Sequence, residues 1–158
     1  METLLTGYYY GQAISGTEDW CLRKELEDLR TETMNALICS PNDHEYRLLE
    51  KILEDEADVV NIHRARPPDP DGLYDRDYDL IIVACEDETG LRHIREWKEQ
   101  DDRIQIIWII EDYKYMKDAF GHSVFDCFQR PYDDGRVRHA IRHVLPKCQR
   151  RYQWQFGP

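Results

Sequence analysis

Near its middle the chain reads Tyr78-Asp79-Leu80-Ile81-Ile82-Val83-Ala84-Cys85, in which aliphatic and β-branched residues follow one another without polar alternation. A strand that is buried on both faces has this pattern, and such strands form the centre of parallel sheets. Two further runs have the same character, residues 35–39 upstream and 104–110 downstream. Segments with helical spacing of apolar residues separate the three runs. The alternation predicts an α/β protein with helices packed on a mostly parallel sheet.

Two weaker patterns complete the predicted sheet. Residues 59–62 are shorter and more polar, as an edge strand would be, and residues 124–128 alternate as a strand. Helical spacing of apolar residues predicts five helices, over residues 18–30, 42–56, 90–100 and 113–120 and from residue 132 onward. The prolines and glycine between residues 66 and 72 restrict any helix there to one or two turns.

A helix-start signal marks the helix over residues 42–56. Asn42 has the side chain of an N-cap, and Glu45 stands at the reciprocal position of a capping box. Tyr46, Leu49, Ile52 and Leu53 follow at the spacing of an inward face.

Composition narrows the class of protein. A chain of 158 residues is predicted to be one domain, and its net charge of −11 opposes binding to nucleic acid or anionic lipid. No run approaches the ~20 apolar residues of a membrane span, and no secretory signal is visible at the start. The five cysteines form no Cys-x-x-Cys pair and are predicted to be reduced thiols. We therefore expect a cytoplasmic protein without a membrane segment.

Three parts of the chain are expected to differ in role. Residues 1–33 form an extension that contains an arm and an amphipathic helix, residues 34–147 form the α/β domain, and residues 148–158 form an aromatic tail. One apolar stripe on the helix of the extension must be covered by the domain, a second copy or a partner. This stripe consists of Trp20, Leu22, Leu26 and Leu29.

The region around the last predicted strand carries a family resemblance. Tyr115, Ala119-Phe120 and Phe125-Asp126-Cys127-Phe128-Gln129-Arg130-Pro131 resemble the fourth helix and fifth strand of response-regulator receiver domains, most closely the receivers that precede LytTR DNA-binding domains. Leu48-Leu49, Gly90 at the third helix and the central strand support the resemblance, which covers residues 34–147. It implies a flavodoxin-like, doubly wound, five-stranded parallel sheet of order 2-1-3-4-5.

The resemblance also implies a phosphorylation pocket, and here the chain departs from the family. Receivers phosphorylate an aspartate after the third strand and hold Mg²⁺ on two acids after the first. A hydroxyl and a lysine bind the phosphate. In this chain the acceptor position falls on Ala84, the acidic pair on Ser40 and Pro41, the hydroxyl on Ile110 and the lysine on Arg130.

These substitutions remove the chemistry of the pocket. Pro41 and Ala84 have no side-chain oxygen for Mg²⁺, and the methyl group of Ala84 cannot be phosphorylated. We therefore expect a pseudo-receiver with no catalytic residue, no metal and no cofactor. Arg130 is predicted to bridge to a nearby carboxylate or carbonyl group.

Other candidate sites have two interpretations each. Glu86-Asp87-Glu88 could bind a cation in place of the lost acids, but a solvated acidic loop is favoured. His139 and His143 have a spacing that permits a shared metal, but no third ligand is evident and an exposed helix face is favoured. Cys85 is interpreted as a structural thiol, because neighbouring acids raise a thiol pKa.

The short helix over residues 113–120 indicates a partner surface. Tyr113, Tyr115 and Met116 crowd a helix with too few inward positions to bury them all, and such side chains are enriched in interface cores. We expect a second copy or another protein to bind the face made by the fourth helix, fifth strand and fifth helix. The basic residues from 136 to 151 and the aromatic residues after them could instead bind single-stranded nucleic acid, but a protein partner is favoured.

The main functional hypothesis is a non-enzymatic signalling or interaction module, a stand-alone pseudo-receiver that acts through protein contact. The alternative is the regulatory part of a transcription regulator whose DNA-binding output is missing or supplied by a partner. A flavodoxin-like enzyme ranks third, because no Gly-rich phosphate loop or acid/base pair lies at the strand ends.

Overall fold

The computed structural model describes residues 33–58, 60–69, 73–74 and 76–155, with side chains as far as Cys148. Contacts divide the chain into residues 1–33 and 34–158, and the fold described below belongs to the second unit. The helix predicted over residues 18–30, with Trp20, Leu22, Leu26 and Leu29, lies outside the described residues.

The sheet has five parallel strands in the order β2-β1-β3-β4-β5. This order confirms the flavodoxin-like sheet predicted from the sequence. The strands are β1 (Met34–Cys39), β2 (Val60–Ala65), β3 (Leu80–Val83), β4 (Gln105–Ile110) and β5 (Asp126–Gln129).

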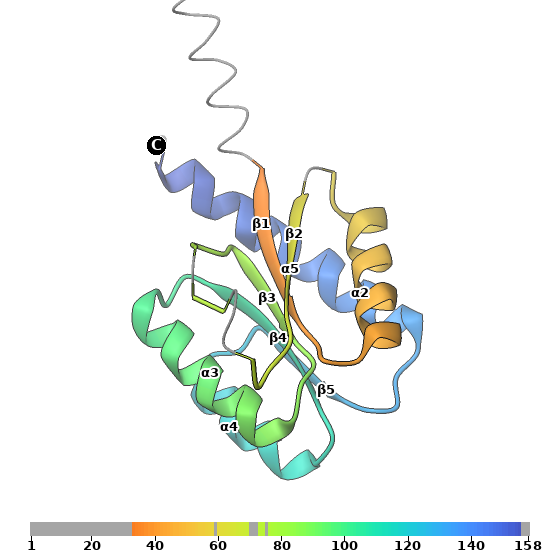
Figure 1. Ribbon diagram of the computed structural model, residues 1–158. Coiled ribbons are helices and arrows are strands. Elements are labelled where there is room, and N and C mark those ends of the chain that lie inside the picture. Colours follow the sequence, from red (N-terminus) through yellow and green to blue (C-terminus); the bar gives the residue numbers. More distant parts are fainter. Residues whose placement is uncertain (1–32, 59, 70–72, 75, 156–158) are drawn as a thin grey trace, which may run out of the picture. The chain divides into compact units, whose positions relative to one another are not determined.

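Helices pack on both faces of the sheet, with α2 and α5 on one face and α3 and α4 on the other (Figure 1). The helices are α2 (Asp43–Glu56), α3 (Asp87–Gln100), α4 (Met116–Gly121) and α5 (Asp134–Gln155), and the 3-10 turn η1 (Tyr113–Tyr115) precedes α4. No helix in the described part of the chain is long and apolar enough to span a membrane.

The lack of polar alternation in the central strands reflects burial on both faces. In β3, Leu80 and Ile82 join the core beneath α2 and α5, while Ile81 and Val83 join the core beneath α3 and α4. Each face buries alternate residues of the same strand, so every position must be apolar.

The start of α2 confirms one half of the predicted capping box. Asn42 is the N-cap, and its Oδ1 accepts a hydrogen bond from the Glu45 backbone N–H at 2.8 Å. The reciprocal role predicted for Glu45 is wrong. Its carboxylate instead accepts hydrogen bonds from Arg130 and Tyr132, two residues that follow strand β5.

Helix α3 begins at Asp87, three residues before the predicted start at Gly90. Gly90 lies inside the helix, where a Cβ would be 3.0 Å from both Trp108 Nε1 and Val83 Cγ1. The glycine therefore permits close packing of the helix on β3 and β4.

Other boundaries also differ from the sequence prediction. Strand β2 continues to Ala65, and β5 begins at Asp126 rather than at residue 124. Helix α5 continues to Gln155, and Cys148 is 2% exposed within the core, so the predicted tail begins inside a packed helix. Between β2 and β3 the described residues form no helix. Leu73 in this connection is buried, and its carbonyl accepts a hydrogen bond from Trp97 Nε1 at 3.0 Å.

Candidate functional site

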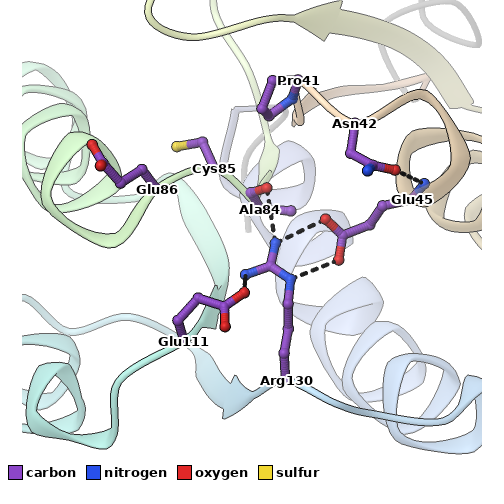
Figure 2. A pocket seen from close by; sticks show the side chains of 8 residues that line it. All are labelled: Pro41, Asn42, Glu45, Ala84, Cys85, Glu86, Glu111 and Arg130. Atoms are coloured by element: carbon purple, nitrogen blue, oxygen red, sulfur yellow. Dashed lines mark hydrogen bonds and ion pairs between the residues drawn. The ribbon is translucent and has the colours of Figure 1, made fainter.

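An open pocket of about 420 Å³ lies at the carboxyl edge of the sheet. Its walls come from the residues that follow β1, β3, β4 and β5 and from the first turn of α2. In doubly wound folds, ligands bind at this edge. The lining side chains, shown in Figure 2, are Pro41, Asn42, Glu45, Ala84, Cys85, Glu86, Glu111 and Arg130.

Arg130 extends from the end of β5 into the pocket (Figure 2). Its Nε and Nη2 donate to the two carboxylate oxygens of Glu45 at 3.1 and 2.8 Å. Nη2 also donates to the Ala84 carbonyl at 2.9 Å, and Nη1 to Glu111 Oε2 at 3.3 Å. The structure thus confirms the prediction that Arg130 bridges to a carboxylate and a carbonyl. Its planar fork suits the bidentate pairing with Glu45.

Tyr132 completes this cluster by donating its phenol O–H to Glu45 Oε2 at 2.7 Å. Burial and the bond to Glu45 raise the pKa of Tyr132 above its ordinary value. Burial opposes the charge on Arg130, but the hydrogen bonds and negative charge of Glu45 outweigh it, so the pKa of Arg130 is raised. Glu45 therefore fixes one cation and one phenol in their protonated forms. We call Glu45, Arg130 and Tyr132 the arginine clamp.

The structure brings together three of the five residues predicted for the degenerate pocket. Pro41, Ala84 and Arg130 line it, whereas Ser40 and Ile110 are fully buried. The hydroxyl of Ser40 donates to the Asn42 carbonyl at 3.2 Å. Ile110 packs in the core beneath α3 and α4. These two positions support the fold beneath the pocket and do not face it.

Sequence reasoning missed Asn42, Glu45 and Glu111 as pocket residues. The sequence pattern assigns Asn42 and Glu45 to helix capping. This pattern does not indicate whether side chains in the first turn of the helix also line a pocket. One signal was available for them. The first turn of a helix that follows a parallel strand stands at the carboxyl edge of the sheet.

In the acidic segment Glu86-Asp87-Glu88 the side chains of Glu86 and Glu88 are exposed, as the sequence predicts, but the segment begins helix α3 and Asp87 is buried. Asp87 is 7% exposed, and its carboxylate accepts hydrogen bonds from the backbone N–H groups of Glu111 and Asp112 at 2.9–3.1 Å. Glu88 accepts from the phenol of Tyr115 at 3.4 Å. Asp87 therefore anchors the segment between β4 and η1.

The pocket does not fit Mg²⁺, the cation that the receiver resemblance implies. Mg²⁺ requires several oxygen ligands, and Pro41 and Ala84 supply no side-chain oxygen. The Ala84 carbonyl and the Glu45 carboxylate already accept hydrogen bonds from Arg130, whose positive charge repels a cation. Among the described residues no three His, Cys, Asp or Glu side chains are grouped to hold a metal ion.

Cys85 has no features of a nucleophile. It is 4% exposed, and burial raises the pKa of its thiol to about 11. The protonated thiol is a weak nucleophile. Its raised pKa agrees with the structural role expected from the sequence.

The predicted partner surface is wrong for Tyr115. This side chain is 8% exposed, and its ring packs edge-on against Trp108. Tyr113 is 66% exposed, as expected, and Met116 is partly buried. Phe120, which the sequence did not assign to the partner surface, is 88% exposed. The apolar surface of η1 and α4 therefore consists of Tyr113 and Phe120.

Among known proteins, the chain is similar to solved structures but matches no family model or curated sequence. A receiver domain protein from Methanospirillum hungatei superposes with a TM-score of 0.62 at 13% identity, over 75% of this chain and 98% of that chain. The response regulatory domain of mrkE from Klebsiella pneumoniae gives 0.62 at 14%, over 74% and 99%.

A third similar structure is HP1043, an orphan response regulator of Helicobacter pylori. Its TM-score is 0.58 at 19% identity, over 74% of this chain and 98% of that chain. The chain therefore has the CheY-like fold of response-regulator receiver domains.

Proposed function

We propose that this chain is a non-enzymatic signalling module, a pseudo-receiver that acts through protein contact and does not use the phosphorylation switch. One observation carries the proposal. The guanidinium of Arg130 is bonded to Glu45 and to the carbonyl of Ala84, the residue that the resemblance aligns with the phosphoacceptor of a receiver.

The chemistry of the pocket supports this proposal. An acyl phosphate forms on a carboxylate, and Ala84 has only a methyl group. Glu45 is the carboxylate of the arginine clamp, but Arg130 and Tyr132 already donate hydrogen bonds to both of its oxygens. A phosphodonor would have to displace these bonds and work without Mg²⁺ to neutralise the developing charge.

Phosphorylation is the first test. We expect no phosphoryl adduct by intact-mass spectrometry when the protein is incubated with acetyl phosphate and Mg²⁺. A receiver domain that has the acceptor aspartate should gain the adduct under the same conditions. A stoichiometric phosphoryl group on any carboxylate of this chain would contradict the proposal.

Contact through η1 and α4 is the second part of the proposal. Tyr113 of η1 and Phe120 of α4 expose aromatic surface, and Lys114 and Lys117 between them in the sequence are also exposed. Aromatic side chains supply much of the energy at interface centres, ~2 kcal/mol or more for a central anchor. We expect this surface, together with β5 and α5, to bind a second copy or a partner protein.

Self-association is tested first because it needs no identified partner. The double variant Tyr113→Ser/Phe120→Ser should weaken a dimer by about 30-fold or more in sedimentation equilibrium, since ~2 kcal/mol corresponds to that factor. Lys51→Ser, an exposed change on α2, is the matched control and should leave association unchanged. A wild-type chain that stays monomeric at high concentration would exclude the homodimer and leave a different protein as the partner.

The regulatory part of a transcription regulator is the alternative function. The net charge of −11 opposes phosphate binding, so we expect no specific duplex binding by the chain on its own. A fluorescence titration with duplex DNA at several salt concentrations tests this expectation. Tight binding that weakens steeply with salt would favour the alternative.

A further inference from the structure

Two exposed histidines stack on the solvent side of α5. His139 and His143 lie one turn apart, their ring centroids are 4.2 Å apart and the ring planes are inclined by 38°. Both side chains are exposed to solvent. We propose that this pair is a two-histidine site for a divalent transition-metal ion such as Zn²⁺ or Cu²⁺, with water in the remaining positions.

The hydrogen bond of His143 supports the proposal by fixing a tautomer. His143 Nδ1 lies 2.7 Å from the His139 carbonyl oxygen. A carbonyl oxygen can only accept, so Nδ1 must carry the proton and the neutral ring presents the Nε2 lone pair to solvent. Histidines that bind metals typically donate their other ring N–H to a carbonyl or carboxylate in this way.

The spacing of the rings also suits a shared ion. Two nitrogen ligands at 2.0–2.1 Å from a tetrahedral zinc lie about 3.3 Å apart. The two ring centroids are 4.2 Å apart, so both rings lie within reach of one shared ion. Imidazole nitrogen is a preferred ligand of zinc and copper, whereas Mg²⁺ and Ca²⁺ prefer oxygen.

Arg138 and Arg142 are next to the two histidines in the sequence, but nearby carboxylates reduce their repulsion of a metal ion. Arg138 pairs with Asp55 and Glu56 of α2, and Arg142 pairs with Glu56 at 2.7 Å. Two carboxylates thus balance two guanidinium groups beside the histidine pair. The chain as a whole carries a net charge of −11, which attracts cations over longer distances.

Calorimetric titration with ZnCl₂ in a non-chelating buffer tests the site. The wild type is compared with His139→Ala, His143→Ala and the matched control His44→Ala, which removes an exposed histidine of α2. Loss of a metal's outer-shell partner typically costs 10–100-fold in affinity, so loss of either ligand should cost at least about tenfold. His44→Ala should bind as the wild type does.

Each outcome decides the proposal. A loss of affinity in both His139→Ala and His143→Ala, with circular dichroism unchanged, supports the site. A shift of the two imidazole proton resonances upon addition of zinc, reversed by EDTA, supports it independently. Wild-type affinity in either single variant would place the ion elsewhere, for example on thiols, and overturn the proposal. Absence of binding to the wild type would also overturn it.

Discussion

Two charged side chains hold the loops at the carboxyl edge of the sheet, and they do so by different means. Asp87 is 7% exposed and binds backbone N–H groups of the segment that follows β4. The Arg130 side chain is 21% exposed and binds mainly carboxylates, Glu45 at 2.8 Å and Glu111 at 3.3 Å. The Asp87 anchor is buried and bonds to the backbone, whereas Arg130 lies in an open pocket and bonds mainly to side chains.

This difference in burial predicts that Asp87 and Arg130 contribute unequally to the free energy of unfolding. Removing a buried acceptor leaves donors unpaired, and each costs ~1–3 kcal/mol. Breaking an ion pair near solvent costs less, because water and salt replace part of the interaction. We therefore infer that Asp87 is mainly a structural residue, while Arg130 joins Glu45 and Glu111 across the pocket without contributing most of the stability.

Asp87→Ala should give the largest effect. The change leaves the Glu111 and Asp112 N–H groups without their acceptor and should lower the free energy of unfolding by about 3 kcal/mol. Urea unfolding followed by circular dichroism measures the loss. Asp87→Asn retains one oxygen and should lose less, and Glu99→Ala, at an exposed position of α3, is a matched surface control. A loss below about 0.5 kcal/mol for Asp87→Ala would contradict the role of Asp87 as a buried anchor.

Arg130→Ala should have an intermediate effect of about 1–2 kcal/mol, because its four hydrogen bonds lie partly in solvent. Arg130→Lys keeps the charge but loses the planar fork and should recover only part of the loss. A double-mutant cycle with Glu45→Ala isolates the pair, and salt should reduce the coupling. Zero coupling at low salt would show that the two side chains do not stabilise one another.

Tyr132→Phe should have the smallest effect, about 1 kcal/mol near neutral pH, and should change the pH dependence. Burial and Glu45 raise the pKa of Tyr132 above its reference of 10.0, so the folded state holds the phenol proton more tightly than the unfolded state does. Its contribution is therefore complete below pH 10 and declines as the pH rises above that value.

The measurement compares urea unfolding of wild type and Tyr132→Phe from pH 8 to pH 11, a range of roughly three units around the phenol reference value. Both proteins retain Cys85, whose raised pKa lowers stability above pH 9 in each, so the difference between them isolates Tyr132. The two curves should converge at the alkaline end. Parallel curves would mean that the phenol proton is not held by Glu45.

The sequence by itself determined the sheet and the side-chain chemistry available at Pro41 and Ala84. Apolar runs without alternation identified the buried strands, because burial on two faces excludes polar side chains at every position. Ala84 and Pro41 excluded an acceptor and a metal ligand, since no fold can add an oxygen to a methyl group or a pyrrolidine ring. The prediction that Arg130 would bridge to a carboxylate or a carbonyl followed from its charge alone.

Only the tertiary structure decided which groups pair with which. Glu45 and Arg130 are 85 residues apart in the chain, and a local capping pattern assigned Glu45 to the wrong partner. The sequence predicts that Asp87 lies in a solvated loop. In the folded chain its carboxylate accepts hydrogen bonds from the backbone N–H groups of Glu111 and Asp112, which follow β4. The ring of Tyr115 packs against Trp108 of β4 and is buried, whereas Phe120 is at the surface. Periodicity and side-chain chemistry are local properties of the sequence, whereas burial and partner choice depend on residues that only folding brings together.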